Sequence, residues 1–188
     1  MPFDRNTPPH ILTLVCVTGL SAMAMNIFLP SLPHMTEYFQ TEYRVIQLSV
    51  ALYKGVNAVL QIIVGPISDR YGRRPVLLWT TVFFIVATLG CIYAPNIEVF
   101  LICRMGQAVI VAGMVLSRAV VRDMVPQDQA ASMIGYVTMG MALVPMVAPA
   151  LGGVLDEAFG WQSTFWAMFV SGVLVLWLTW SDLGETAE

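Results

Sequence analysis

Five polar side chains interrupt long apolar stretches of this 188-residue sequence, and their spacing groups them on helix faces. Lys54, Asn57 and Gln61 are spaced i, i+3, i+7, so a helix carries all three on one face. Arg104 and Gln107, three residues apart, share a face of another helix. Polar groups inside apolar spans are costly and usually face a cavity or a partner. These side chains are therefore candidates for binding a solute or a coupling ion.

The apolar stretches around them are long enough to cross a membrane. The chain is 57% hydrophobic and 11% charged, with a mean hydropathy of +0.74, whereas soluble domains carry about a quarter charged residues. About 30 Å of hydrocarbon takes roughly 20 helical residues. We expect an all-α membrane protein with six transmembrane helices, not a soluble bundle or an outer-membrane barrel. The predicted spans are approximately 11–29, 46–66, 75–94, 97–121, 132–155 and 163–181.

Basic residues gather on one side of this topology. The loops on the other side hold Arg44 alone, among several acids. By the positive-inside rule both termini are cytoplasmic, and the first apolar run is a retained helix and not a signal peptide. The cytoplasmic side then holds Arg5, Arg70, Arg73, Arg74, Arg118 and Arg122.

Three polar residues have a similar expected depth in the membrane. Counting about 1.5 Å per residue from the outer helix ends, Asn26, Lys54 and Arg104 each lie roughly 10–13 Å deep. We expect them to form one polar layer in a cavity wall. Snorkelling to the interface is the alternative for the two cations, and for Lys54 the two interpretations are equally open.

The stretch GPISDRYGRRP at 65–75 holds more than membrane anchoring requires. We expect Gly65 to end the second helix where helices approach closely, and Gly72 to permit a tight reversal. Asp69 stands among three arginines, where its carboxylate can accept charge-assisted hydrogen bonds.

This stretch resembles the loop signature of major facilitator superfamily transporters, roughly G-x-x-x-D-R-x-G-R-R. Three further stretches resemble its proton-coupled drug antiporters: RMGQAVIVAGMVLSRAVVRD at 104–123, APALGG at 148–153 and GWQSTFW at 160–166. FLPSLP at 28–33 is similar to the Bcr/CflA (bicyclomycin/chloramphenicol resistance) branch. The matching loop residues are Gly65, Asp69, Arg70, Gly72, Arg73 and Arg74.

The resemblance implies one half, a 3+3 inverted repeat, of a twelve-helix fold with alternating access to a cavity between halves. Residues 1–188 would be the N-terminal six-helix bundle, with the C-terminal half absent, and Glu185 and Thr186 would open the loop toward it. The implied activity is multidrug or small-molecule efflux by proton antiport in the cell (inner) membrane. Its partners would be the lipid bilayer, a small drug-like substrate, the proton, and the missing half or a second copy. No cofactor, metal or nucleic acid is implied.

The resemblance also implies roles for particular residues. Asp69 would latch the outward-facing state, with Arg118 as its partner within this half. Arg104, together with Gln107, would help couple proton binding to substrate binding. The kinked and closely packed antiporter motif of the fifth helix would comprise Pro145, Pro149, Gly152 and Gly153.

Four positions depart from the family pattern. Ala108, Ile110 and Ala148 replace glycines, and Asn26 stands where relatives usually have Asp. An amide cannot carry a proton through a transport cycle, and none of the twelve acids lies within a predicted hydrocarbon core. Either the missing half supplies a carboxylate, or Lys54 deprotonates, or the cavity favours neutral or anionic substrates. We favour the last hypothesis.

Other function classes fit less well. A half-size subunit or scaffold, inactive alone and working only as a dimer or with a separate C-terminal half, is the main alternative. A channel filter such as TVGYG and the enzyme motifs HExxH and GxSxG are absent, as is the nucleotide loop GxxxxGK[ST]. The cysteines form no CxxC pair, and His10 and His34 stand apart, so no metal site is expected.

Overall fold

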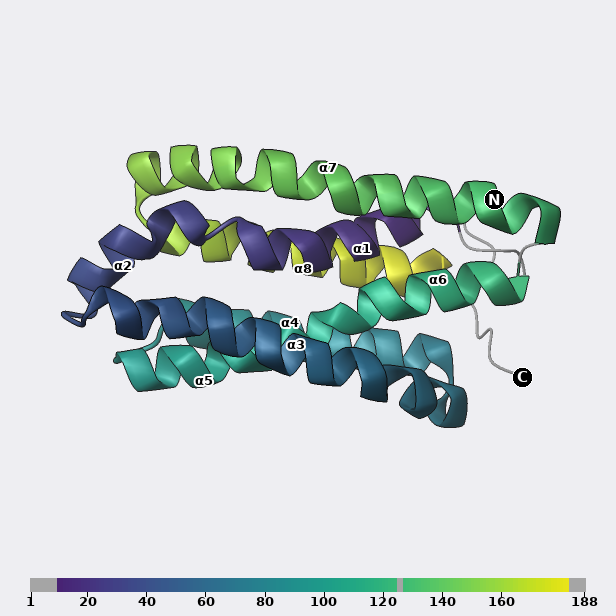
Figure 1. The fold of residues 1–188 in the computed structure, drawn as a ribbon, viewed down its shortest axis with the longest axis horizontal. Helices are drawn as coiled ribbons and strands as arrows, with labels where there is room; N and C mark the ends of the chain where they lie inside the picture. The colour runs from purple at the N-terminus through teal and green to yellow at the C-terminus, as the bar shows by residue number, and fades with distance from the viewer. Residues whose placement is uncertain (1–9, 125–126, 183–188) are drawn as a thin grey trace.

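The computed structural model describes residues 10–124 and 127–182 as a bundle of long helices running along one axis (Figure 1). Within these ranges, six helical segments are long and apolar enough to cross a membrane, which confirms the predicted all-α class with six spans. Arg5, Glu185 and Thr186 lie outside the described residues. The six segments are Ile11–Tyr38, Tyr43–Tyr71, Arg73–Ile92, Ile97–Asp123, Ala131–Phe159 and Gln162–Asp182.

The first segment is broken near its middle. Helix α1 (Ile11–Asn26) gives way to a short 3₁₀ turn, η1 (Leu29–Ser31), and then to helix α2 (Leu32–Tyr38). Pro30 has no N–H to donate to the Asn26 carbonyl, so one α-helical hydrogen bond is missing at this break. The predicted span 11–29 thus ends at the break, and α2 continues the segment beyond it to Tyr38.

The fourth segment is also irregular. Helix α5 (Ile97–Gln107) tightens into the 3₁₀ turn η2 (Ala108–Val111) before helix α6 (Ala112–Met124) begins. The Asn96 side chain caps the start of α5 by accepting a hydrogen bond from Val99 N at 2.9 Å. At the turn, the Ile110 carbonyl accepts a hydrogen bond from Ser21 Oγ at 2.6 Å, which ties η2 to α1.

Helices α3 (Tyr43–Tyr71) and α4 (Arg73–Ile92) are joined by a single residue, Gly72. Its φ of 91° is a value that favours glycine, and the expected tight reversal is present. The expectation that Gly65 ends the second helix is wrong, because α3 continues through it for six more residues to Tyr71. A Cβ added at Gly65 would meet nothing within 4 Å, so no close helix approach is found there.

Helix α7 (Gln127–Phe159) packs along α1 (Figure 1). Gly140 and Gly152 on α7 face α1 and its continuation, and a Cβ added at Gly140 would lie 2.9 Å from Val15 Cγ1. A Cβ added at Gly152 would lie 1.8 Å from the Ile27 carbonyl oxygen. Only glycine allows this approach, so the α1–α7 seam is built on close backbone contact.

Helix α8 (Gln162–Asp182) returns beside α4 and α1. Its last residue, Asp182, is buried and accepts hydrogen bonds at Oδ2 from His10 N (2.8 Å) and Thr13 Oγ1 (2.5 Å). An acid at a helix N-terminus satisfies free N–H groups and favours the helix dipole. The contact fixes the first turn of α1 against the last turn of α8.

Candidate functional site

Arg104 lies at the centre of the bundle and is 1% exposed. One guanidinium nitrogen donates to Gln107 Oε1 and another to the Ala24 carbonyl, each at 2.6 Å. The rings of Phe28 and Tyr53 lie 4.1 Å from its central carbon. Two rings, an amide and a carbonyl from three different spans therefore surround the cation, and we call this group the Arg104 cage.

Arg104 is buried in the bundle and does not extend to its surface. Its guanidinium is held inside the bundle by rings and by uncharged hydrogen-bond acceptors, which distribute its charge without a carboxylate. Its Nε is buried and has no hydrogen-bond partner among the described residues. One donor of a fixed cation thus has no acceptor within the part of the chain that the structure describes.

Gln107 is held from the other side. Its Nε2 donates to Thr88 Oγ1 at 2.7 Å, and the Thr88 hydroxyl in turn donates to the Phe84 carbonyl at 2.7 Å. Both side chains are completely buried. Because each polar atom in this chain of contacts has a partner, the Gln107 oxygen is aimed at Arg104 before any ligand arrives.

The remaining predicted cavity residues lie near the cage without joining it. Asn26 turns back on its own helix and donates to the Ala22 carbonyl at 2.7 Å. Asn57 is buried and accepts from Gln61 Nε2 at 2.7 Å, so these two share a face as the spacing predicted. Lys54 and Gln61 are exposed on α3, and within the described residues Lys54 has no hydrogen bond or ion pair.

The α3–α4 turn forms a second polar cluster. Arg73 is 8% exposed, and its Nε lies 2.5 Å from Asp123 Oδ2 on α6. The same guanidinium reaches Asp69 Oδ1 at 3.3 Å. The expected pairing of Asp69 with Arg118 is therefore wrong, because Arg73 stands between Asp69 and α6. Arg118 lies more than one turn before Asp123 on α6 and donates instead to the Met141 sulfur at 3.3 Å.

The other arginines of the turn point elsewhere. Arg70 is exposed and lies over the ring of its neighbour Tyr71, at 5.5 Å. Arg74 donates to the Trp180 carbonyl at 3.3 Å, which links the turn to α8. The three arginines of the turn thus make three different kinds of contact, and of these three Arg73 is the one that forms ion pairs with other helices.

The glycines of the fifth-span motif lie against the break in the first span. Pro145 and Pro149 are inside α7, and α7 continues through both. Gly152 touches the Ile27 carbonyl and Gly153 lies beside Pro30, in the break between α1 and α2. The motif thus packs α7 against the segment that also supplies Phe28 to Arg104.

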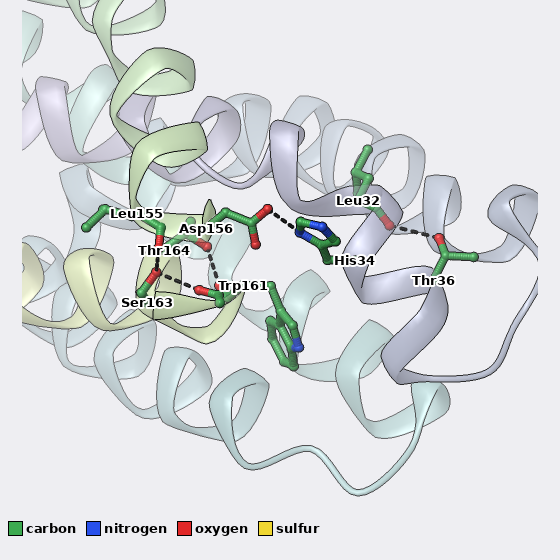
Figure 2. A network of polar contacts seen from close by, with 9 residues as sticks. Leu32, His34, Thr36, Leu155, Asp156, Trp161, Ser163 and Thr164 are labelled. Carbon is green, nitrogen blue, oxygen red and sulfur yellow. Dashed lines mark hydrogen bonds and ion pairs between the residues drawn. The ribbon is translucent and has the colours of Figure 1, made fainter. Parts of the chain in front are cut away.

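A further pair was missed by the sequence reasoning. His34 Nδ1 on α2 lies 2.6 Å from Asp156 Oδ2 on α7 (Figure 2), although His34 seemed isolated in the sequence. The turn after Asp156 is fixed by Ser163 Oγ, which donates to Leu155 O at 2.9 Å and to Gly160 O at 2.6 Å. The broken first span brings α2 over the end of α7, a geometry that no local pattern revealed.

Two apolar grooves lie away from these residues. One of about 550 Å³ runs between α4 and α8, lined by Trp79, Trp177 and Trp180 among others. Another of about 370 Å³ lies between α1, α7 and α8. Neither is lined by any predicted site residue, so the apolar hollows do not mark the polar site.

Comparison with known proteins places these features in a family. The family model described as Major Facilitator Superfamily matches residues 14–187. A chloramphenicol resistance protein of Pseudomonas aeruginosa is 35% identical over 78% of this chain, and multidrug resistance protein D of Escherichia coli (strain K12) is 30% identical over 85%. The chain covers 35% and 41% of those proteins, so it spans less than half their length.

A solved structure shows the same fold. A bacterial homologue of the human lysosomal transporter Spinster, in an inward-facing and occupied conformation, superposes with a TM-score of 0.81 at 19% identity. The match covers 94% of this chain and 44% of that one. The six-helix bundle is therefore half of such a fold, as expected, and the chain is a multi-pass membrane protein that is not an enzyme.

Proposed function

Because this chain belongs to the major facilitator superfamily, we propose that it contributes one six-helix half of a proton-coupled exporter of small drug-like molecules, acting by alternating access. The names of two relatives, a chloramphenicol resistance protein and a multidrug resistance protein, support drug-like substrates. On this proposal the exporter lies in the inner membrane, with the α3–α4 turn and both termini facing the cytoplasm. We also propose that the chain belongs to the Bcr/CflA branch.

The Arg104 cage is the observation that carries this proposal. A cation buried among two rings, with one donor unpaired, suits a ligand that offers a hydrogen-bond acceptor or a negative charge. A lipophilic cation would meet like charge in low dielectric. We therefore propose neutral or anionic substrates, and we expect ethidium-like cations to be exported poorly.

The exposed polar face of α3 supports a second six-helix unit. Lys54 and Gln61 are exposed in this bundle, although they lie well inside a membrane span. A charged side chain facing lipid at that depth is costly, so this face is expected to border a water-filled cavity or a partner. The partner would be a C-terminal half, in the same or another polypeptide, or a second copy of the chain.

The test is gradient-driven transport in liposomes. Vesicles would hold the chain alone or with a co-expressed C-terminal half, and labelled chloramphenicol would be followed under an imposed proton gradient. We expect concentrative transport that Arg104→Ala abolishes. The matched control is Arg44→Ala, which removes an arginine whose side chain is 92% exposed and should leave transport unchanged.

The outcomes separate the candidate functions. Transport by the chain alone indicates a dimeric half-transporter, and transport only with the second half indicates a subunit of a twelve-helix exporter. Export of ethidium at the rate of chloramphenicol contradicts the proposed substrate class. The absence of gradient-driven flux in both preparations favours the scaffold, in which the bundle serves assembly and not transport.

A further inference from the structure

The His34–Asp156 pair has features that a purely structural contact does not need (Figure 2). The Asp156 side chain is 4% exposed, whereas that of His34 is 55% exposed. The second Asp156 oxygen, Oδ1, is buried and has no hydrogen-bond partner in the described part of the chain. A buried carboxylate with one partner is poorly stabilised, so the charge on His34 decides how well it is tolerated.

We propose that this pair is where the chain binds its coupling proton, an assignment that rests on the proton-coupled transport proposed above. It fills the gap left by Asn26, whose amide cannot titrate. The pair has an acid, a base and an exposed side from which water can deliver the proton. Binding the proton forms one N–H bond on the His34 ring, the proton coming from water on the exposed side, and release breaks that bond; no oxidant or reductant is needed.

The geometry assigns the exchanging proton to one ring nitrogen. An ionised carboxylate can only accept hydrogen bonds, so Nδ1 of His34 carries the hydrogen that faces Asp156 Oδ2. Nε2 is then the nitrogen that gains or loses the coupling proton. Without that proton the pair has one net negative charge. With it, the pair is an imidazolium–carboxylate ion pair of zero net charge.

Other titratable groups at this end of the bundle leave the pair to itself. In the described residues, no hydrogen bond or ion pair joins any of them to His34 or Asp156, and Arg44 reaches Glu42 only at 3.9 Å. The helix α8, which follows Asp156 across the turn, begins with uncharged residues. The groups on α2, α3, α5 and α7 are Glu37, Tyr38, Glu42, Tyr43, Arg44, Glu98 and Glu157.

The pair is mechanically connected to the Arg104 cage. Asp156 lies one turn, about 6 Å, beyond Gly152, which touches the carbonyl at the break of the first span. The next residue of that break, Phe28, is one of the two rings over Arg104. Proton binding therefore strengthens the hold of α2 on α7 at one end of a segment whose other end contacts the proposed substrate site.

The first test separates coupling from movement of substrate. With the membrane potential clamped, one-for-one exchange against a gradient of one pH unit sustains about tenfold accumulation of chloramphenicol. We expect His34→Gln and Asp156→Asn to lose this accumulation while exchanging labelled for unlabelled chloramphenicol at equal pH as the wild type does. The matched control, Glu157→Gln, removes the adjacent exposed acid and should keep full accumulation.

Two results would overturn the assignment. The first is tenfold accumulation by His34→Gln or by Asp156→Asn. The second is loss of chloramphenicol exchange, as well as accumulation, in variants that are folded, which indicates a structural role. If Asp156→Asn does not fold, His34→Gln decides, because that side chain is half exposed.

A second measurement does not depend on transport. Nitrogen NMR of the lipid-embedded chain should show His34 Nε2 gaining a proton as the pH falls, with a midpoint that moves in Asp156→Asn. His10 is the internal reference and should not respond to that substitution. An unmoved His34 midpoint would refute the proton site. A wild-type chain that titrates in this way but never transports would instead refute the proposed function.

Discussion

Replacing Arg104 with lysine keeps the charge and removes the geometry of the cage. The guanidinium makes two charge-assisted hydrogen bonds, each worth about 1.5–3 kcal/mol, and two ring contacts of about 0.5–2 kcal/mol each. A lysine ammonium is a point charge that cannot span both acceptors and stacks less well. Either the Gln107 oxygen or the Ala24 carbonyl loses its ionic partner.

The expected loss is one of the two hydrogen bonds and part of the ring contact, or about 2–4 kcal/mol of unfolding free energy. For a chain of this length that lowers the Tm by about 4–16 °C, at roughly 2–4 °C per kcal/mol. The assay is thermal unfolding of the purified chain in detergent, followed by the exposure of the buried Cys91 thiol.

Lys54→Met is the matched control, since it removes the other cation of the same membrane layer. Lys54 is exposed and makes no polar contact within the described residues, so its loss should change stability by no more than about 0.5 kcal/mol. If Lys54→Met destabilises the chain as much as Arg104→Lys does, the cage is not what holds Arg104, and the reasoning fails.

Three further changes test the seam, the turn and the chain ends. Gly152→Ala places a methyl group 1.8 Å from the Ile27 carbonyl oxygen, so it should lower the unfolding free energy by about 3 kcal/mol or more. Gly153→Ala is the control and should be tolerated, because its nearest atom would be 3.8 Å away. Equal effects of the two variants would contradict the close α1–α7 seam. Asp123→Asn should lower the Tm more than Asp69→Asn, because the Asp69 side chain is 65% exposed and such pairs contribute about 0–1 kcal/mol; the reverse order would restore Asp69 as the principal partner. Asp182→Ala should cost about 0.5–2 kcal/mol and speed hydrogen exchange in the first turn of α1, and unchanged exchange there would show that the cap is dispensable.

The sequence predicts the architecture because the signals that set it are local. Six apolar runs of sufficient length become six spans, and Gly72 permits the reversal at which α3 meets α4. The spacing of Asn57 and Gln61 also predicts a real contact, since residues four apart on a helix are neighbours. Arg104 and Gln107 follow the same rule.

The partners between helices could not be predicted in this way. Tyr53 and Phe28 read as ordinary apolar positions, and their rings become ligands of Arg104 only once three spans pack together. Asp69 was assigned to Arg118 by resemblance, while Arg73 occupies the intervening space. His34 and Asp156 are 122 positions apart, and only the proline break at Pro30 turns α2 toward α7.

The two intramembrane cations, Arg104 and Lys54, differ in whether groups of their own bundle bind them. Arg104 is already held by groups of its own bundle, so its position costs no reorganisation when a ligand arrives. Lys54 has no hydrogen bond or ion pair within the described residues, and on the proposed function its exposed side chain faces a region from which lipid is excluded. Arg104 thus has its partners within this bundle, whereas a partner for Lys54 would have to come from a second unit. A second six-helix unit should therefore change the environment of Lys54 and leave the Arg104 cage unchanged. The rate of chemical labelling of Lys54, compared between the chain alone and the chain with a C-terminal half, measures the first of these effects.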